Sequence, residues 1–484
     1  MKCVGGDCHF HGRKQNMQRS VQLLLQNTLI YEYDTKLKIS HILQIIQRDT
    51  SEINIETPES LTEAFLRRLL MCDTNARSVK CLSSDLEMDK KNAINPLDLI
   101  AGLFLCSDKF LQQNMVGKMV QCQFAVTLLL PNVETRELTM MLWSMREIVQ
   151  NFTALQQAFR GTGSEERLVF SEMPLVSFAR PGKHFLSKSQ MLNKLLSNRC
   201  GDVPRRISEG LVEFSWYLPC GNRSVDKFSE PMAVANLRGD IRSFDKQFTF
   251  LCQSSAVVYI LCEESEVEYF KYLQGKQLQA KVILISSKRG KSFRLTVEPN
   301  LKTTNLSETK TTETELARPL QESVSQMLGK KSKKVSLENL AERAWRCEIL
   351  VDDDSNECRS ALKYARKITA RIDKISEFKD EELPTQGDIW KAISWVQTEH
   401  WKLRKAGKIK AEEYRKTLER AEKEFKKKQQ RFEMTTTMSN FLNGWSASEV
   451  HLFPEMVGND TRGSVPAPAV SSTESIHDTK NEVS

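Results

Sequence analysis

Apolar residues recur every three or four positions through the first third of the chain, which is the spacing of one face of an α-helix. In the stretch "TPESLTEAFLRRLLMC", Leu61, Phe65 and Leu69 fall on one such face. The later stretch "NPLDLIAGLFLCSDKFLQQNMVGKMVQC" continues the periodicity with a wider apolar face. The pattern predicts a helical domain over residues 17–165, after a disordered terminus over residues 1–16.

The pattern changes at about residue 168, where short runs rich in Val, Ile and Phe replace the helical spacing. The runs are "MPLVSFA", "GLVEFSWYL", "PMAVANL", "AVVYILC" and "AKVILIS", and helical stretches separate most of them. Strands that alternate with helices predict a mainly parallel sheet, and therefore an α/β domain over residues 168–300. The second and third runs are joined by a loop without a helix, so these two strands are expected to be antiparallel neighbours.

The remainder of the chain is polar and strongly charged. Residues 301–317 have few hydrophobic side chains and are predicted to form a linker, and residues 318–445 are predicted to form a helical extension. In "IKAEEYRKTLERAEKEFKKKQQRFE", opposite charges lie three and four positions apart, which is typical of a long helix that packs through one narrow seam. Residues 446–484 are rich in Ser, Thr, Pro and Asn and are predicted to be a disordered tail.

Composition limits the class of protein. The 484 residues include 70 basic and 62 acidic side chains, a net charge of +8, without a compact basic stripe interleaved with aromatic residues. Nucleic-acid binding is therefore not indicated. The 12 cysteines follow no repeating frame. Because neither a signal peptide nor an apolar run long enough to span a membrane is present, the sequence predicts a protein of the cytoplasm or nucleus.

One loop in the α/β region has the residue types of a phosphate-binding loop. Such loops follow G-x-x-x-x-G-K-[ST] between a strand and a helix, because backbone N–H groups, a helix N-terminus and a lysine hold the phosphates. In "SFARPGKHFLSKSQML" the final Lys188 and Ser189 fit, but Ser187 stands where the second glycine belongs. Lys188 would reach the β- and γ-phosphates, and the Ser189 hydroxyl would bind Mg²⁺. The candidate nucleotide-binding residues of the loop are Gly182, Lys183, His184, Phe185, Leu186, Ser187, Lys188 and Ser189.

An ordinary surface turn could contain a Lys-Ser pair by coincidence, so a second motif is needed to support the assignment of a phosphate-binding loop. P-loop GTPases end the third strand of the domain with D-x-x-G, and here "MAVANLRGD" places Asn236 and Gly239 at these positions. Asparagine brings no charge, so Mg²⁺ affinity and hydrolysis are both expected to be weak, with Asp240 substituting in part. No threonine lies between the two motifs, and Ser208 is the candidate metal ligand in its place. The segment "SKRG" lacks the aspartate that reads guanine, so the base preference stays open.

These stretches, together with "EMPLVSFARPGKHFLSKSQMLNKLL", "EPMAVANLRGDI" and "ELPTQGDIW", resemble the family of the interferon-inducible very large GTPases and the up-regulator of cell proliferation. The resemblance runs from about residue 20 to 445. It implies a P-loop GTPase-like domain of the dynamin-like class, binding of GTP with Mg²⁺, a cytosolic and nuclear location, and oligomerisation. Family members are far longer, so the chain is expected to be a truncated member.

Two functional hypotheses follow. The first is a GTP-binding protein with weak or absent hydrolysis, whose variant loop binds phosphate with Mg²⁺. The second is a helical scaffold with a vestigial nucleotide domain, which recruits protein partners through its helical regions. No Cys-His or Ser-His pairing at a suggestive spacing is present, so no catalytic residue is assigned.

Overall fold

The structure is a computed structural model, and it describes most of the chain between residues 36 and 447. The described residues are 36–39, 58–76, 95–132, 135, 137–146, 148, 151–152, 166–182, 188, 191–192, 195, 207–222, 224–263, 279–287, 293–297, 302–305, 313–328, 332–370, 372, 375–382, 387–406, 411–430 and 434–447. The predicted disordered terminus lies outside them, as does the predicted tail except for residues 446–447, which are helical.

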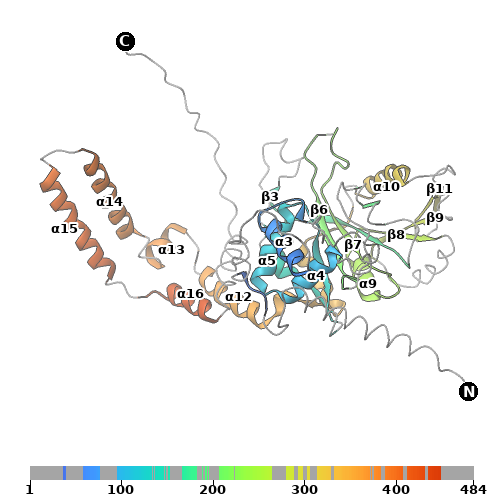
Figure 1. Cartoon of the computed structure of the whole chain (residues 1–484), viewed down its shortest axis with the longest axis horizontal. Coiled ribbons are helices and arrows are strands. Elements are labelled where there is room, and N and C mark those ends of the chain that lie inside the picture. Colours follow the sequence, from blue (N-terminus) through green and yellow to red (C-terminus); the bar gives the residue numbers. More distant parts are fainter. Residues whose placement is uncertain are drawn as a thin grey trace, which may run out of the picture. The chain divides into compact units, whose positions relative to one another are not determined.

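The chain forms two compact units (Figure 1). The first contains residues 1–155 and 166–359, and the second contains residues 156–165 and 360–484. None of the described helices is long and apolar enough to cross a membrane.

A parallel sheet lies at the centre of the first unit. Its strands run in the spatial order β7-β5-β8-β9, and each is parallel to its neighbour. They are β5 (Met173–Ala179), β7 (Met232–Leu237), β8 (Val257–Glu263) and β9 (Lys281–Ser287). Every residue of β5 and β7 is buried, because both faces of the sheet are covered, and this explains why their sequences are continuous apolar runs. The predicted α/β class of this region is confirmed.

Further strands extend this sheet on both sides to a total of 11 strands, and all are antiparallel to their neighbours except β13, which is parallel to β2. The order across it is β11-β10-β9-β8-β5-β7-β6-β1-β2-β13, and β12 pairs with the start of β5. The added strands are β1 (Val126–Pro131), β2 (Leu138–Met140), β6 (Val212–Tyr217), β10 (Phe293–Val297), β11 (Lys302–Asn305), β12 (Lys334–Val335) and β13 (Leu350–Val351). Strand β6 is antiparallel to β7, as the helix-free connection predicts. A separate antiparallel pair consists of β3 (Asn151–Phe152) and β4 (Glu166–Arg167).

Two sequence predictions need correction here. The segment 17–165 is not entirely helical, because β1 and β2 lie within it and β1 pairs with β6. The segment 301–317 is not only a linker, since it contains β11 and the start of α10 (Glu313–Met327). In the first segment a strand distant in sequence, β6, pairs with β1, and in the second β11 pairs with the preceding β10 and α10 packs into the core, so that contacts outside each segment stabilise structure that its composition does not reveal.

Helices precede β1 and pack on the sheet's extension. They are α3 (Pro58–Leu70), α4 (Pro96–Cys106) and α5 (Lys109–Gln121), and the short α6 (Leu142–Met145) follows β2. Asn95 and Asp108 cap α4 and α5, because their side chains accept backbone N–H groups of the first turn. The apolar faces of α3, α4 and α5 lie in one core with β1 and β6.

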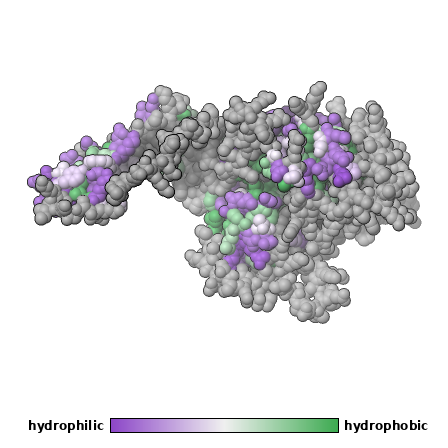
Figure 2. Space-filling model, turned by 90° about the horizontal axis from the view of Figure 1, so that it is seen from above, coloured by the Kyte–Doolittle hydropathy of each residue, from purple (hydrophilic) through white to green (hydrophobic). Residues whose placement is uncertain are grey.

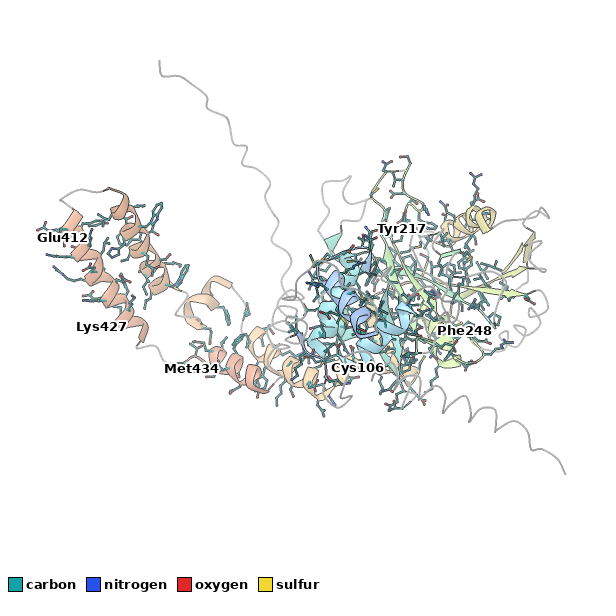
Figure 3. All side chains as sticks on the ribbon, in the orientation of Figure 1. Cys106, Tyr217, Phe248, Glu412, Lys427 and Met434 are labelled. Atoms are coloured by element: carbon teal, nitrogen blue, oxygen red, sulfur yellow. The ribbon has the colours of Figure 1, made fainter. Side chains whose placement is uncertain are left out.

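Different helices cover the two faces of the central sheet, and Figure 1 shows α9 (Asp245–Ser254) and α10 on opposite sides of the strands. Phe248 of α9, labelled in Figure 3, belongs to one core cluster together with residues of α11 (Leu337–Arg346). Leu320 and Val324 of α10 belong to the other cluster, with the helical residues Met191, Leu192 and Leu195. After β13 come η4 (Asp352–Asp354) and α12 (Asn356–Thr369).

The second unit is helical where the structure describes it. Its helices after α12 are α13 (Ile375–Glu382), α14 (Asp388–Ala406), α15 (Ala411–Gln430) and α16 (Thr436–Ala447). Helices α14 and α15 form a hairpin, with Ile393, Val396 and Leu418 buried. Glu412 and Lys427 lie toward opposite ends of α15 in Figure 3, and hydrophilic residues cover much of the hairpin surface in Figure 2.

Candidate functional site

The candidate loop begins where β5 ends. Strand β5 lies between β7 and β8, and the chain visits first one side of it and then the other. Ligands of open α/β sheets bind at this kind of reversal, at the carboxyl ends of the strands. Gly182 follows β5 closely and has a φ of 56°, a left-handed conformation that favours glycine.

Lys188 returns to the ends of two neighbouring strands. Its side chain is only 3% exposed. The ammonium group donates a hydrogen bond to the carbonyl oxygen of Leu237 in β7 and a longer one, of 3.5 Å, to that of Phe178 in β5. A lysine is rarely buried without polar partners, and here the carbonyl oxygens at the carboxyl ends of β5 and β7 accept hydrogen bonds from its ammonium group.

The second motif lies directly beside the first. Asn236 is the penultimate residue of β7, and its Nδ2 donates a 3.0 Å hydrogen bond to Glu213 in β6. Gly239 follows with a φ of 96°, and a Cβ built there would lie 2.5 Å from the ring of Phe244. Gly210, which has a φ of 84°, lies against the same ring. Only glycine allows the backbone to pass so close to Phe244 at these two points.

Asp240 joins the two motifs. Burial acts to raise its pKa, but hydrogen bonds from Arg242 and from the backbone N–H of Gly182 outweigh it, and the pKa lies below its ordinary value. The backbone N–H of Ile241 donates to the carbonyl of Arg180 at 3.0 Å. The segment after β7 is therefore fastened to the loop after β5.

Ser208 is hydrogen-bonded to Asp98 of helix α4. Its backbone N–H and its hydroxyl donate to Oδ1 of Asp98 at 2.8 and 2.7 Å, and the N–H of Ile207 donates to the same atom at 3.0 Å. Asp98 lies in the first turn of α4. The metal-binding role of Ser208 stays a prediction. The remaining candidates lie outside the described residues: Lys183, His184, Phe185, Leu186, Ser187 and Ser189.

Sequence reasoning missed three residues that order this site: Asp98, Glu213 and Arg238. Each is at most 5% exposed. Arg238 forms an ion pair with Glu213, and its Nε donates to Glu213 Oε2 at 2.7 Å. A signal was present, because Asp98 and Glu213 interrupt otherwise apolar stretches, and charged residues are seldom buried unless they are paired.

Within the described part of the chain, no three His, Cys, Asp or Glu side chains are grouped so that they could hold a metal ion. The oxygen of the Asn236 amide is buried and accepts no hydrogen bond from the described residues. Such an oxygen suits Mg²⁺ or one of its bound waters, and Mg²⁺ usually takes few protein ligands beside phosphate and water. The site therefore fits a magnesium ion that arrives with a phosphate ligand.

The fold and the site together define an α/β domain with a lysine-containing loop at the carboxyl end of its central strand. The family of up-regulator of cell proliferation-like domains matches residues 94–369, and the N-terminal domain of the same family matches residues 22–96. The first match covers more than half of the chain, and the chain belongs to this family.

Relatives agree with this assignment. Up-regulator of cell proliferation from Homo sapiens is 34% identical over 380 residues, which cover 73% of this chain and 40% of that protein. The Bos taurus protein of the same name is 29% identical over 514 residues, covering 92% of this chain and 56% of that protein. Interferon-induced very large GTPase 1 from Homo sapiens is 28% identical over 349 residues, covering 67% of this chain and 14% of that protein. The chain thus spans about half the length of the first two relatives. No solved structure matches.

Proposed function

We propose that the first unit binds a guanine nucleotide with Mg²⁺ at the carboxyl end of β5, with weak or absent hydrolysis. The observation that carries this proposal is the burial of Lys188 between the ends of β5 and β7. A lysine at this point of an open parallel sheet supplies the fixed positive charge that nucleotide phosphates need.

The strand arrangement supports the same proposal. Four parallel strands in the order β7-β5-β8-β9, with β6 antiparallel at the edge of β7, bring the two candidate motifs to adjacent strand ends. In the proposed complex the loop backbone and Lys188 hold the phosphates, and the Ser189 hydroxyl and the Asn236 oxygen lie on the Mg²⁺ side. Magnesium would supply charge neutralisation at the β- and γ-phosphates.

Weak hydrolysis follows from the residues at the second motif. Asn236 replaces a carboxylate with a neutral amide, and a neutral ligand attracts Mg²⁺ less strongly. The preference for guanine rests on relatives, two of which carry "GTPase" in their names. Location in the cytoplasm or nucleus, and oligomerisation, are proposed on the resemblance alone.

Equilibrium binding of fluorescent GTP and ATP analogues tests the proposal. We expect micromolar binding of the GTP analogue that requires Mg²⁺ and is lost in Lys188→Ala. Lys281→Ala is a matched control, because Lys281 is exposed and begins β9 at the opposite ends of the parallel strands. Equal binding by the wild type and Lys188→Ala would contradict the proposal.

A helical scaffold with a vestigial nucleotide domain is the second candidate. It is favoured by the fact that other groups of the protein already bind the loop: backbone carbonyl oxygens accept from Lys188, and the Asp240 carboxylate accepts from the backbone N–H of Gly182. The second unit also exposes large side chains, with Trp390 and Trp395 more than half exposed. A scaffold predicts no binding of either nucleotide.

A further inference from the structure

Three buried polar side chains form a cluster beside the second motif. Glu213, Asn236 and Arg238 are 5%, 7% and 3% exposed. Glu213 and Asn236 are directly opposite each other on the antiparallel strands β6 and β7. Side chains at opposite positions of such a pair lie on the same face of the sheet, close enough to interact.

The cluster fixes the orientation of the Asn236 amide. Glu213 Oε2 accepts from Asn236 Nδ2 at 3.0 Å and from Arg238 Nε at 2.7 Å. An ionised carboxylate can only accept hydrogen bonds, so the amide must present its NH₂ group to Glu213. Its oxygen is thereby turned away from Glu213, and it is buried without a donor among the described residues.

The oxygen lies on the side of the sheet that carries Lys188. Successive side chains of a strand alternate between faces, so Asn236 shares a face with Val234. Val234 belongs to the same core cluster as Met191 and Leu192, two helical residues that follow Lys188 in the sequence. The Lys188 ammonium group also donates to the carbonyl of Leu237, the residue after Asn236.

We propose that Glu213 is a positioning residue, which holds the Asn236 amide with its oxygen toward the magnesium and phosphate side of the site. This inference rests on the proposed function and refines it. Asparagine at position 236 is then needed because Glu213 is beside it, and it is not the remnant of an aspartate that lost its function. An aspartate there would place a second carboxylate beside Glu213, and two buried carboxylates in contact cannot both ionise easily.

A double-mutant cycle separates the two interpretations. The variants are Asn236→Asp, Glu213→Gln and the double variant, which exchanges the amide and the carboxylate and keeps a carboxylate for Arg238. At pH 7.5, Asn236→Asp should weaken Mg²⁺-dependent GTP binding by about tenfold, because the two neighbouring carboxylates repel each other. The double variant should recover to within about threefold of the wild type. Tighter binding by the single Asn236→Asp variant would overturn the proposal, because it is the result expected of a degraded aspartate.

Thermal melting of the same four proteins without nucleotide gives an independent reading. Asn236→Asp should lower the melting temperature at pH 7.5 more than at pH 5.5, because protonation of a carboxylate at lower pH relieves the repulsion, and the double variant should restore it. Additive effects of the two substitutions at both pH values would show that the pair is not coupled, and would overturn the proposal. If the wild type binds no better than Lys188→Ala, the proposed nucleotide function is wrong. The melting cycle alone then decides whether Glu213 orients the amide.

Discussion

At the scale of single residues, two glycines shape the segment after β7. Gly210 and Gly239 lie against the ring of Phe244, and each has a positive φ. Hydrogen bonds between Gly210 N–H and Arg238 O, and between Arg238 N–H and Leu211 O, both of 2.8 Å, join the two segments beside that ring. The sequence predicted Gly239 from its spacing to Asn236, but Gly210 was not predicted, because its hydrogen-bond partner Arg238 lies 28 residues later in the chain.

Gly239→Ala should destabilise the first unit. A Cβ would lie 2.5 Å from the Phe244 ring, and the left-handed backbone alone costs an alanine about 1–2 kcal/mol. Gly117→Ala is the matched control, because Gly117 lies inside α5 with no atom within 4 Å of the added Cβ. That control should stabilise the protein by up to about 1 kcal/mol. Denaturant unfolding measures both, and equal effects of the two substitutions would contradict the packing described here.

A buried carboxyl group makes stability depend on pH. Burial raises the pKa of Asp352 from 3.8 to about 6, although the backbone N–H of Trp143 donates to it at 2.7 Å and Lys109 lies 3.9 Å away. The folded state therefore binds more protons than the unfolded state between these values, and the contribution of Asp352 to stability falls as pH rises through this window.

Asp352→Asn should gain stability relative to the wild type as pH rises. The difference in unfolding free energy between variant and wild type should grow by about 3 kcal/mol between pH 4 and pH 7, because the variant lacks the carboxyl group whose pKa rises from 3.8 to about 6 on folding. Asp354→Asn, two positions along and with its carboxylate accepting from the Trp345 indole, is the control. A variant curve parallel to that of the wild type would show that Asp352 keeps an ordinary pKa.

At the scale of elements, one helix of the N-terminal layer holds a segment of the candidate site. Asp98 of α4 accepts three hydrogen bonds from Ile207 and Ser208. The same segment includes Gly210, whose backbone N–H donates to the carbonyl oxygen of Arg238, the residue before Gly239. The helical layer is thereby coupled to both motifs of the site.

Asp98→Ala should loosen that coupling. The loss of three hydrogen bonds to a buried carboxylate is expected to cost about 2–4 kcal/mol of unfolding free energy and to speed amide exchange in residues 207–211 and 238–241. Asp108→Ala, which removes the cap of the neighbouring α5, should cost about 1 kcal/mol and leave those residues unchanged. Equal exchange in the two variants would place the restraint on this segment elsewhere.

Sequence patterns predicted the elements of the α/β core better than those around it. The runs of β5, β7 and β8 are apolar at almost every position, which is how a strand covered on both faces reads. The β1 run "VTLLLP" is equally apolar, but it follows amphipathic helices, and its pairing with the short β2 and with β6, more than 80 residues later, makes it a strand. Glu213 was also missed, because its partners Asn236 and Arg238 lie 23 and 25 residues later, at the end of β7 and just after it.

At the scale of the whole molecule, the described part of the chain combines an α/β unit that carries both candidate motifs with a helical unit. The motifs were predicted from their spacing, and the structure brings Gly182, Lys188 and Asp240 to neighbouring strand ends. The family follows from the match over residues 94–369. The central claim is that the loop after β5 binds a nucleotide. Such binding would affect the whole loop, so it has to be measured over the whole segment and not at one contact.

Amide hydrogen exchange with and without saturating Mg²⁺-GTP tests that claim most directly, in the wild type and in Lys188→Ala. We predict slower exchange in residues 180–196 and 236–241 of the wild type when the nucleotide is present, and no such change in Lys188→Ala. Unchanged exchange in both segments of the wild type would contradict a phosphate site at the end of β5.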